Sequence, residues 1–358
     1  MYRNICATSD PPRENPTPVI WSPPSLLPVG RCHRIAWRGL GAAAGEPWLV
    51  LHGGPGSGAQ PGLVTPLDLH CQRAIVPDQR GSGASRPRGS TRGNHLQALV
   101  ADLEALRVHL SLERWAVLAG SWGTVLALAY AQRHPQRVQR LVLRGAFALR
   151  WREIGGLLLP TPQTRQRLGN EPFWPIQVGT PLPVALRRLA QVLQTGTLGV
   201  AALRVTRRWA VLEAGLAEHG MKRSERLARL DGDLALAAAI HREWAVLHRR
   251  LRSAQAQARQ PRRLPADHAA LRKYRIQVHY LRHRGFVRPG QLDRAVRELT
   301  QQGVPIEWVH GRCDAVCPPA NSHRWAAVGG RLRLPLAGHL GHEPALVAAL
   351  RAVVRGGA

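Results

Sequence analysis

Short apolar runs, bounded by glycine, proline or aspartate, alternate along the chain with segments whose apolar residues recur at helical spacing. These runs are too short for helices, and an apolar character on both faces is typical of buried parallel strands. The alternation predicts an α/β fold with a mostly parallel, doubly wound sheet. The expected strands lie at residues 48–51, 74–76, 115–118, 141–143, 306–309 and 331–334.

The middle of the chain has a different pattern. Residues 151–300 repeat alanine, leucine and arginine at helical spacing with almost no strand signal, which predicts an inserted α-helical cap. The sheet domain would then consist of residues 31–150 and 301–358. Residues 214–270 carry the least specific pattern, and we expect them to be partly mobile. Residues 1–30 are rich in proline and are expected to form an irregular N-terminal arm.

The composition narrows the class of protein. With 358 residues, 44% of them hydrophobic, the chain can bury a full core, which excludes a wholly disordered protein. No apolar run approaches about 18 residues, the length that a transmembrane helix requires. The first residues lack the apolar stretch of a signal peptide, and five cysteines, an odd number, do not indicate a disulfide framework. We therefore expect a cytoplasmic protein without a membrane partner.

The charge balance is strongly basic. Lysine and arginine number 50 against 22 aspartate and glutamate residues, a formal net charge of +28, and residues 201–300 hold 22 of the basic and 9 of the acidic residues. A basic surface attracts nucleic acid, membrane headgroups or anionic substrates, so a non-catalytic basic binding protein is one hypothesis. A solvated, arginine-rich surface is the simpler interpretation, and we expect no dedicated nucleic-acid partner.

One motif carries a catalytic signature. Ser121 lies in the stretch Leu118-Ala-Gly-Ser-Trp-Gly-Thr124, between an expected strand and an expected helix. A nucleophile elbow needs this context, because small neighbours let the backbone make a tight turn that exposes the serine hydroxyl. The usual first glycine of the G-x-S-x-G pattern is Ala119 here, which is also small. We predict Ser121 as a nucleophile rather than a structural turn residue.

A serine hydroxyl needs a base and an orienting acid, which in α/β-hydrolases follow it in the order serine, acid, histidine. Asp314 follows the strand at 306–309 and is the expected acid. His339 follows the strand at 331–334 and is the expected base, with His342 as its rival. The histidines of the helical region are expected to lie on the surface.

The stretch His52-Gly-Gly-Pro-Gly56 follows the first expected strand. The backbone N–H of Gly54, together with that of Trp122, would form an oxyanion hole, since glycine places no Cβ in the way. Cys313 and Cys317, near two histidines, raise the alternative of a metal site. Four-ligand zinc sites usually have a second pair of closely spaced ligands, so we expect no metal and no cofactor.

Six stretches share one resemblance. They are His52-Gly-Gly-Pro-Gly56, Asp78-Gln-Arg-Gly-Ser-Gly-Ala-Ser85, Leu99-Val-Ala-Asp-Leu-Glu104, Gly120-Ser-Trp-Gly123, His310-Gly-Arg-Cys-Asp314 with Cys317-Pro318, and Ala337-Gly-His339. Together they resemble the proline iminopeptidase family, serine peptidases of the α/β-hydrolase fold that remove N-terminal proline. The resemblance runs from about residue 35 to 345 and is weak at 214–270. It implies release of proline from small peptides through an acyl-enzyme on Ser121.

The resemblance also implies how the substrate is held. In that family two cap glutamates hold the N-terminal amino group. The corresponding positions are Glu213, in Trp209-Ala-Val-Leu-Glu213, and Gln277, in Tyr274-Arg-Ile-Gln-Val-His-Tyr280. Loss of one carboxylate in a basic cap weakens binding of a cationic amine, although an amide oxygen still accepts a hydrogen bond. A hydrolase acting on other amides or esters is therefore the alternative, and the sequence indicates no oligomeric state.

Overall fold

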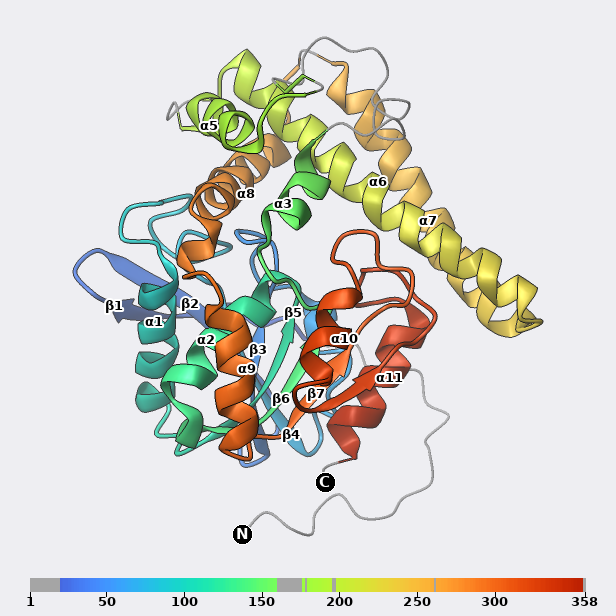
Figure 1. Ribbon diagram of the computed structural model, residues 1–358. Coiled ribbons are helices and arrows are strands. Elements are labelled where there is room, and N and C mark those ends of the chain that lie inside the picture. Colours follow the sequence, from blue (N-terminus) through green and yellow to red (C-terminus); the bar gives the residue numbers. More distant parts are fainter. Residues whose placement is uncertain (1–19, 160–175, 178, 195–197, 261, 357–358) are drawn as a thin grey trace.

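The computed structural model describes residues 20–159, 176–177, 179–194, 198–260 and 262–356. An eight-stranded sheet lies at its centre, with its strands in the order β1-β2-β4-β3-β5-β6-β7-β8 (Figure 1). The strands are β1 (Ser25–Val29), β2 (His33–Gly41), β3 (Glu46–Leu51), β4 (Gln72–Pro77), β5 (Trp115–Gly120), β6 (Val138–Arg144), β7 (Ile306–Val309) and β8 (Arg331–Arg333).

Most of the sheet is parallel. Strands β4, β3, β5, β6, β7 and β8 run parallel to their neighbours in this order, whereas β2 is antiparallel to both β1 and β4. Strand residues alternate between two buried layers, with Leu49 and Ile75 in one and Trp48 and Val76 in the other. The runs are apolar throughout because both faces are covered. The predicted α/β fold is confirmed.

Two strands, β1 and β2, were not expected. β1 lies within residues 1–30, so the prediction of an irregular arm is wrong for the end of that segment; residues 1–19 lie outside the described residues. β1 is the edge strand, where Pro28 is tolerated because one side of the strand needs no hydrogen-bond donor. Most of its residues are exposed, so it lacks the apolar run that identified the central strands.

Helices cover both faces of the sheet (Figure 1). One face packs against α1 (Leu96–His109), α2 (Trp122–Arg133) and α9 (Gln291–Gln301), and the other against α11 (Pro344–Arg355). The short helix α10 (Ala320–Ala326) follows β7, and single 3-10 turns lie at Pro61–Leu63, Pro135–Arg137 and Arg284–Phe286. Because α9 packs beside α2, the cap ends before residue 291 and not at residue 300 as expected. An amphipathic pattern does not specify which apolar surface covers the helix.

The other helices lie above the carboxyl ends of the parallel strands (Figure 1). They are α3 (Trp151–Leu158), α5 (Leu182–Leu193), α6 (Val200–Leu230), α7 (Leu234–Ala258) and α8 (Pro265–Arg282). Trp209 of α6 and Tyr274 of α8 are buried in the same apolar cluster as Leu49 and Ile75 of the sheet. Helices α3, α5, α6 and α8 therefore share one continuous core with the sheet, whereas Ala237 and Ile240 of α7 belong to a separate cluster.

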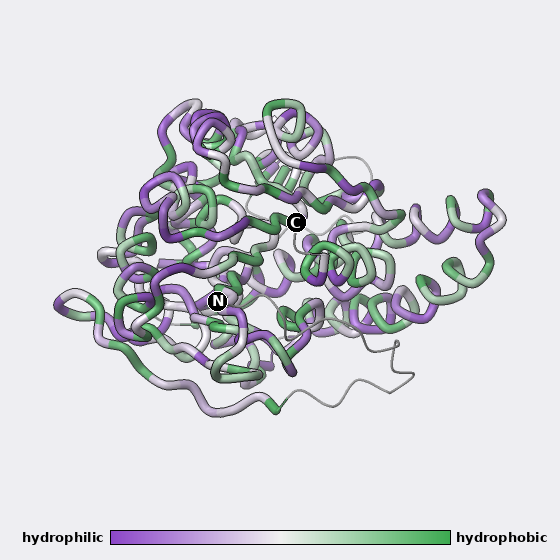
Figure 2. Tube along the Cα trace, turned by 90° about the horizontal axis from the view of Figure 1, so that it is seen from below, coloured by the Kyte–Doolittle hydropathy of each residue, from purple (hydrophilic) through white to green (hydrophobic). Residues whose placement is uncertain are grey.

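α6 and α7 form a long hairpin that projects beyond the sheet domain (Figures 1 and 2). At the turn, the Asp233 side chain accepts a hydrogen bond of 2.9 Å from the Leu236 N–H and so caps α7. Hydrophilic and hydrophobic positions are interspersed along both helices (Figure 2), which is typical of helices with one covered face. Residues 214–270 are thus mostly helical, and their partial mobility stays a prediction. None of the described helices is both long enough and apolar enough to cross a membrane.

Candidate active site

Ser121 occupies a strained turn between β5 and α2. Its backbone has φ 56° and ψ −126°, a conformation that non-glycine residues rarely adopt. Its glycine neighbours are needed for space. A Cβ on Gly120 would collide with the Arg144 guanidinium, and one on Gly123 would lie 2.8 Å from the Leu51 carbonyl oxygen. The local sequence therefore fixes the shape of the predicted nucleophile elbow.

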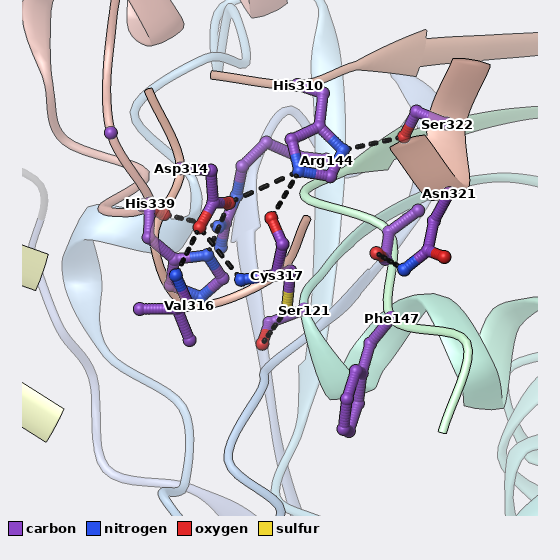
Figure 3. Close-up of polar contacts among 12 residues, drawn as sticks. Ser121, Arg144, Phe147, His310, Asp314, Val316, Cys317, Asn321, Ser322 and His339 are labelled. Atoms are coloured by element: carbon purple, nitrogen blue, oxygen red, sulfur yellow. Dashed lines mark hydrogen bonds and ion pairs between the residues drawn. The ribbon is translucent and has the colours of Figure 1, made fainter. Parts of the chain in front are cut away.

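Two hydrogen bonds hold this turn, and the Ser121 hydroxyl faces a thiol. The Ser121 N–H donates to the Arg144 carbonyl at 2.9 Å, and the Thr124 hydroxyl donates to the Ser121 carbonyl at 2.7 Å. The Ser121 Oγ lies 3.9 Å from the Cys317 Sγ (Figure 3). Within the described residues, Ser121 has no hydrogen bond to His339, so the hydroxyl is turned toward Cys317.

Asp314 and His339 form a hydrogen-bonded pair, with Asp314 buried and His339 partly exposed. Asp314 follows β7 and His339 follows β8, and the distance from the His339 Nδ1 to the Asp314 Oδ2 is 2.7 Å (Figure 3). With Nδ1–H donating to the carboxylate, the His339 Nε2 is free to accept a proton. The rival base, His342, is exposed and instead lies 3.8 Å from Glu243 of α7.

The Asp314 carboxylate is held on both oxygens. Oδ1 accepts hydrogen bonds of 2.8 Å from the N–H groups of Val316 and Cys317, and Oδ2 lies 3.3 Å from the Nε2 of His310. Burial alone would raise the pKa of this carboxyl, but the charge of His339 and the hydrogen bonds from His310 and His339 hold it well below its usual range. Asp314 therefore stays ionised and orients the imidazole.

His310 supports the acid from behind. It is fully buried, with Nδ1 2.7 Å from the Ser322 Oγ and Nε2 2.9 Å from the Cys317 carbonyl oxygen (Figure 3). Cys313 and Cys317 are free thiols. Among the residues that the structure describes, no three His, Cys, Asp or Glu side chains are grouped to hold a metal ion.

The loop that carries His339 is fixed by a buried carboxylate. Glu343 accepts hydrogen bonds from the N–H groups of Gly338, at 2.7 Å, and Leu340, at 2.8 Å, on either side of His339. Arg144 donates to the His339 carbonyl oxygen at 2.5 Å. Burial raises the pKa of the Glu343 carboxyl to about 7, although its two backbone hydrogen bonds act in the opposite direction.

The glycine-rich loop after β3 lies against the elbow. A Cβ on Gly53 would lie 3.1 Å from the Ser121 Cβ, so this position also needs glycine. Gly54 has φ +117°, in the region that favours glycine. The predicted oxyanion donors, Gly54 and Trp122, are therefore carried by two segments that meet at Ser121.

Gln79 ties these two segments together. Its N–H donates to the His52 Nε2 at 3.1 Å, and its side-chain nitrogen donates to the His52 carbonyl oxygen at 2.9 Å. Its side-chain oxygen accepts a hydrogen bond of 2.9 Å from the Trp122 Nε1. The loop at 78–81 is thus tied to the residue next to Ser121.

Helix α6 packs directly on the loops of the acid and the base. A Cβ on Gly220 would lie 2.7 Å from the Cys313 carbonyl oxygen, next to Asp314. A Cβ on Gly338 would lie 3.0 Å from the Met221 nitrogen. Two glycines therefore allow α6 to touch both loops.

The cap brings Glu213 and Gln277 together. The Gln277 Nε2 donates to one oxygen of Glu213 at 2.6 Å. The other oxygen accepts from the Lys273 Nζ at 2.5 Å and from the Tyr274 hydroxyl at 3.1 Å, and the Tyr274 ring stacks on Trp209. Burial and the nearby carboxylate raise the pKa of Tyr274 well above its usual value. Glu213 is therefore already paired with a cation.

Gln277 is buried, and its side-chain oxygen has no hydrogen-bond partner. An unsatisfied buried acceptor is costly, which favours a donor from a bound molecule. The same turn of α8 touches the glycine-rich loop, since a Cβ on Gly56 would lie 2.7 Å from the Lys273 carbonyl oxygen and 3.1 Å from the Ile276 Cβ. This cap cluster therefore adjoins the loop that borders Ser121.

Known proteins are similar to this chain in fold and in sequence. The alpha/beta hydrolase fold family matches residues 47–175. The proline iminopeptidase of Neisseria meningitidis serogroup A is 33% identical over 337 residues, covering 90% of this chain and 92% of that protein. The proline iminopeptidase of Xylella fastidiosa strain 9a5c is 32% identical over 336 residues, covering 91% and 93%.

The chain belongs to the proline iminopeptidase family. It is a hydrolase, and the resemblance predicted from its motifs is confirmed. Among solved structures, the proline iminopeptidase-related protein of Thermus thermophilus has a TM-score of 0.51 and 23% identity, covering 92% of this chain and 96% of that one. An esterase of Thermogutta terrifontis has a TM-score of 0.52 and 17% identity, covering 93% and 97%. These two similarities show the fold alone.

Membership of this family does not test individual residues, so the catalytic roles of Ser121, Asp314 and His339 stay predictions. Sequence reasoning missed the contact of Cys317 with Ser121, because the two are 196 residues apart and no local pattern links them. It also missed Lys273, although a lone lysine beside the second cap motif was a visible signal.

Proposed function

We propose that the protein is a serine aminopeptidase that releases N-terminal proline from small peptides. Hydrolysis is supported by Ser121, which lies on a strained elbow in the same cluster as the hydrogen-bonded Asp314–His339 pair (Figure 3). The relatives named proline iminopeptidase, which span most of the chain, support the choice of substrate.

In the proposed reaction, the Ser121 hydroxyl turns from Cys317 toward His339 and attacks the carbonyl carbon of proline. The His339 Nε2 takes the hydroxyl proton, and Asp314 stabilises the resulting imidazolium. The N–H groups of Gly54 and Trp122 donate to the oxyanion, each contributing roughly 3 kcal/mol in the transition state. His339 then protonates the leaving amine, and water hydrolyses the acyl-enzyme by the same proton transfers in reverse order.

The cap cluster would receive the imino nitrogen of the substrate. The N–H groups of the substrate donate to the Glu213 carboxylate and to the side-chain oxygen of Gln277. That oxygen has no hydrogen-bond partner among the described residues. Lys273 must give up part of its contact with Glu213 for this to happen. Recognition of the amine is therefore possible but weaker than with two free carboxylates.

A second candidate function follows from the same cluster. The Lys273 Nζ lies 2.5 Å from the Glu213 carboxylate, and the second acidic position is Gln277. Both features favour substrates without a free amine, so hydrolysis of other amides or of esters is the alternative.

Kinetics separate the two functions. We expect a higher kcat/KM for prolyl and alanyl arylamides, with proline ahead of alanine, than for N-acylated prolyl arylamide or short acyl esters. Faster turnover of the blocked substrates would overturn the aminopeptidase proposal and support the alternative.

Labelling tests whether the site is catalytic at all. A fluorophosphonate should label the wild type and fail to label Ser121→Ala, because the reagent needs an activated serine. Absence of labelling in folded wild-type protein would favour the non-catalytic binding hypothesis, and steeply salt-dependent retention on DNA would then be its positive test.

A further inference from the structure

A cavity lies where the chain passes between the sheet domain and the cap. Its volume is about 150 Å³. Residues 148–150, on the way from β6 to α3, form one wall, and Arg284 and residues 287–290, on the way from α8 to α9, form another. Residues 291–293, Arg324 and Trp325 complete the lining. The two segments in which the chain crosses between the sheet domain and the cap, here called the crossings, therefore meet at this cavity.

The lining is strongly basic. Four arginines face one carboxylate, and they are Arg150, Arg284, Arg288 and Arg324. That carboxylate, Asp293, is already bound by Arg324 at 2.7 Å and by the Trp325 Nε1 at 2.7 Å. Three positive charges are thus left without a compensating negative charge in the lining.

Arg150 and Arg288 are exposed, and Arg284 is partly buried. Within the described ranges, no hydrogen bond or ion pair occupies the guanidinium groups of Arg150, Arg284 and Arg288; the Arg284 group lies over the Trp151 ring at 5.5 Å. The Nε atoms of Arg284 and Arg324 are buried without a partner. A buried donor without an acceptor is costly, so these two Nε groups favour a bound acceptor, which the exposed Arg150 and Arg288 could also reach.

The backbone adds to the same field. Helix α9 begins at this cavity, with Gly290 as a cap that supplies no side-chain acceptor. The first N–H groups of a helix carry a partial positive charge and favour anions. The arginine side chains and the N-terminus of α9 therefore both carry positive charge toward the cavity.

We propose that this cavity binds a small oxyanion, a phosphate or a carboxylate group. Guanidinium groups pair with both through charge-assisted hydrogen bonds, often two at a time. The bound group would connect the two chain crossings, since its partners Arg150 and Arg288 come from different ones.

The cavity is also linked to the elbow. A Cβ on Gly285 would lie 2.5 Å from the Leu149 Cδ1 and 2.9 Å from the Trp122 ring, so one crossing packs on the residue next to Ser121. An anion that joins the crossings therefore stabilises the cap on the sheet domain. The proposal concerns binding and does not depend on the substrate.

Thermal unfolding and calorimetry of the full chain test this site. Inorganic phosphate and citrate are compared with sodium chloride at equal ionic strength. We expect a higher Tm with at least one of the two anions, and at least tenfold weaker binding of that anion to Arg288→Gln. A response to phosphate alone identifies a phosphate ligand, and a response to citrate alone identifies a carboxylate.

Matched variants keep the test specific. Arg226→Gln removes the same charge from an exposed position on α6 and should bind the anion like the wild type. Arg284→Gln, from the same wall as Arg288, should repeat the loss. Equal anion binding by Arg288→Gln and Arg226→Gln, or no Tm shift beyond that of chloride, would overturn the proposal.

Discussion

The Glu213 carboxylate has three side-chain donors around it, and one of them carries a full positive charge. Lys273 and Gln277 come from one turn of α8, and Tyr274 lies between them. A carboxylate that is already paired attracts a second cation less strongly. Under the proposed function, Lys273 therefore competes with the substrate amine for Glu213.

Replacing this lysine should improve the use of free amines. Lys273→Met leaves Glu213 with neutral partners, so KM for prolyl arylamide should fall roughly tenfold, or about 1.4 kcal/mol, with little change in kcat. Lys222→Met, at the only other lysine, is the control. The same fall in KM for an N-acylated substrate would contradict this explanation.

Glu343 should give the protein a characteristic pH dependence. Its pKa is near 4.5 when unfolded and about 7 when folded, so between these values the folded state binds more protons. Stability is then greatest below pH 4.5 with respect to this group and falls as pH rises through about 7, by on the order of 3 kcal/mol.

Urea unfolding across this pH range measures the effect. In Glu343→Gln the contribution disappears, and the difference in unfolding free energy between the wild type and the variant should vary with pH in this window. A difference that is independent of pH would show that Glu343 titrates normally.

At the scale of elements, the central strands and the elbow were predictable because their signals are local. Buried parallel strands are apolar on both faces, and the turn at Ser121 needs small residues beside it. The edge strand β1 was missed because most of its residues are exposed. The end of the cap was misplaced because the periodicity of α9 does not reveal that it packs on α2.

Contacts between distant segments were beyond local pattern. Cys317 meets Ser121, Lys273 meets Glu213 and Glu343 holds the His339 loop only because the fold brings these residues together. The positions of Asp314 and His339 were predictable because they follow strands in a known order. The hydrogen bonds that fix them were not.

The contact of α6 with the loops of Asp314 and His339 can be tested with two glycine variants. Gly220→Ala introduces a Cβ 2.7 Å from the Cys313 carbonyl oxygen, so α6 or the Asp314 loop must shift, and kcat should fall at least about tenfold. Gly156→Ala, in helix α3, has no atom within 4 Å. It should retain activity and gain up to about 1 kcal/mol of stability. Full activity of Gly220→Ala would contradict the supporting role of α6.

At the scale of the molecule, the charge is concentrated where the substrate amine is expected. Residues 201–300 hold 22 basic and 9 acidic residues, and this range includes most of the cap helices and both Glu213 and Gln277. A positive field repels a cationic substrate, and salt screens this repulsion. The excess of basic residues is therefore expected to affect the choice of substrate, and it does not identify the class of protein.

Salt dependence measures this repulsion. Raising the salt concentration from about 0.01 M to about 1 M should lower KM for prolyl arylamide several-fold, because screening shortens the range of the field. KM for an uncharged N-acylated substrate should change little. A rise in KM for the free amine would mean that local attraction by Glu213 exceeds the repulsion of the cap.

One uninterrupted helix, α6, carries Glu213 and also packs on the loops of Asp314 and His339. Glu213 and Gly220 are seven residues apart, close to two turns of 3.6 residues each, so they share one side of a single helix. Lifting that helix would withdraw Glu213, the carboxylate proposed to bind the amine, and uncover the loops of Asp314 and His339 in the same movement. Under the proposed function, capture of the substrate and assembly of the catalytic groups would then be two readouts of one conformational equilibrium. A mutation that weakens the seating of α6 should reduce the fraction of competent molecules without altering the chemistry of those that remain closed.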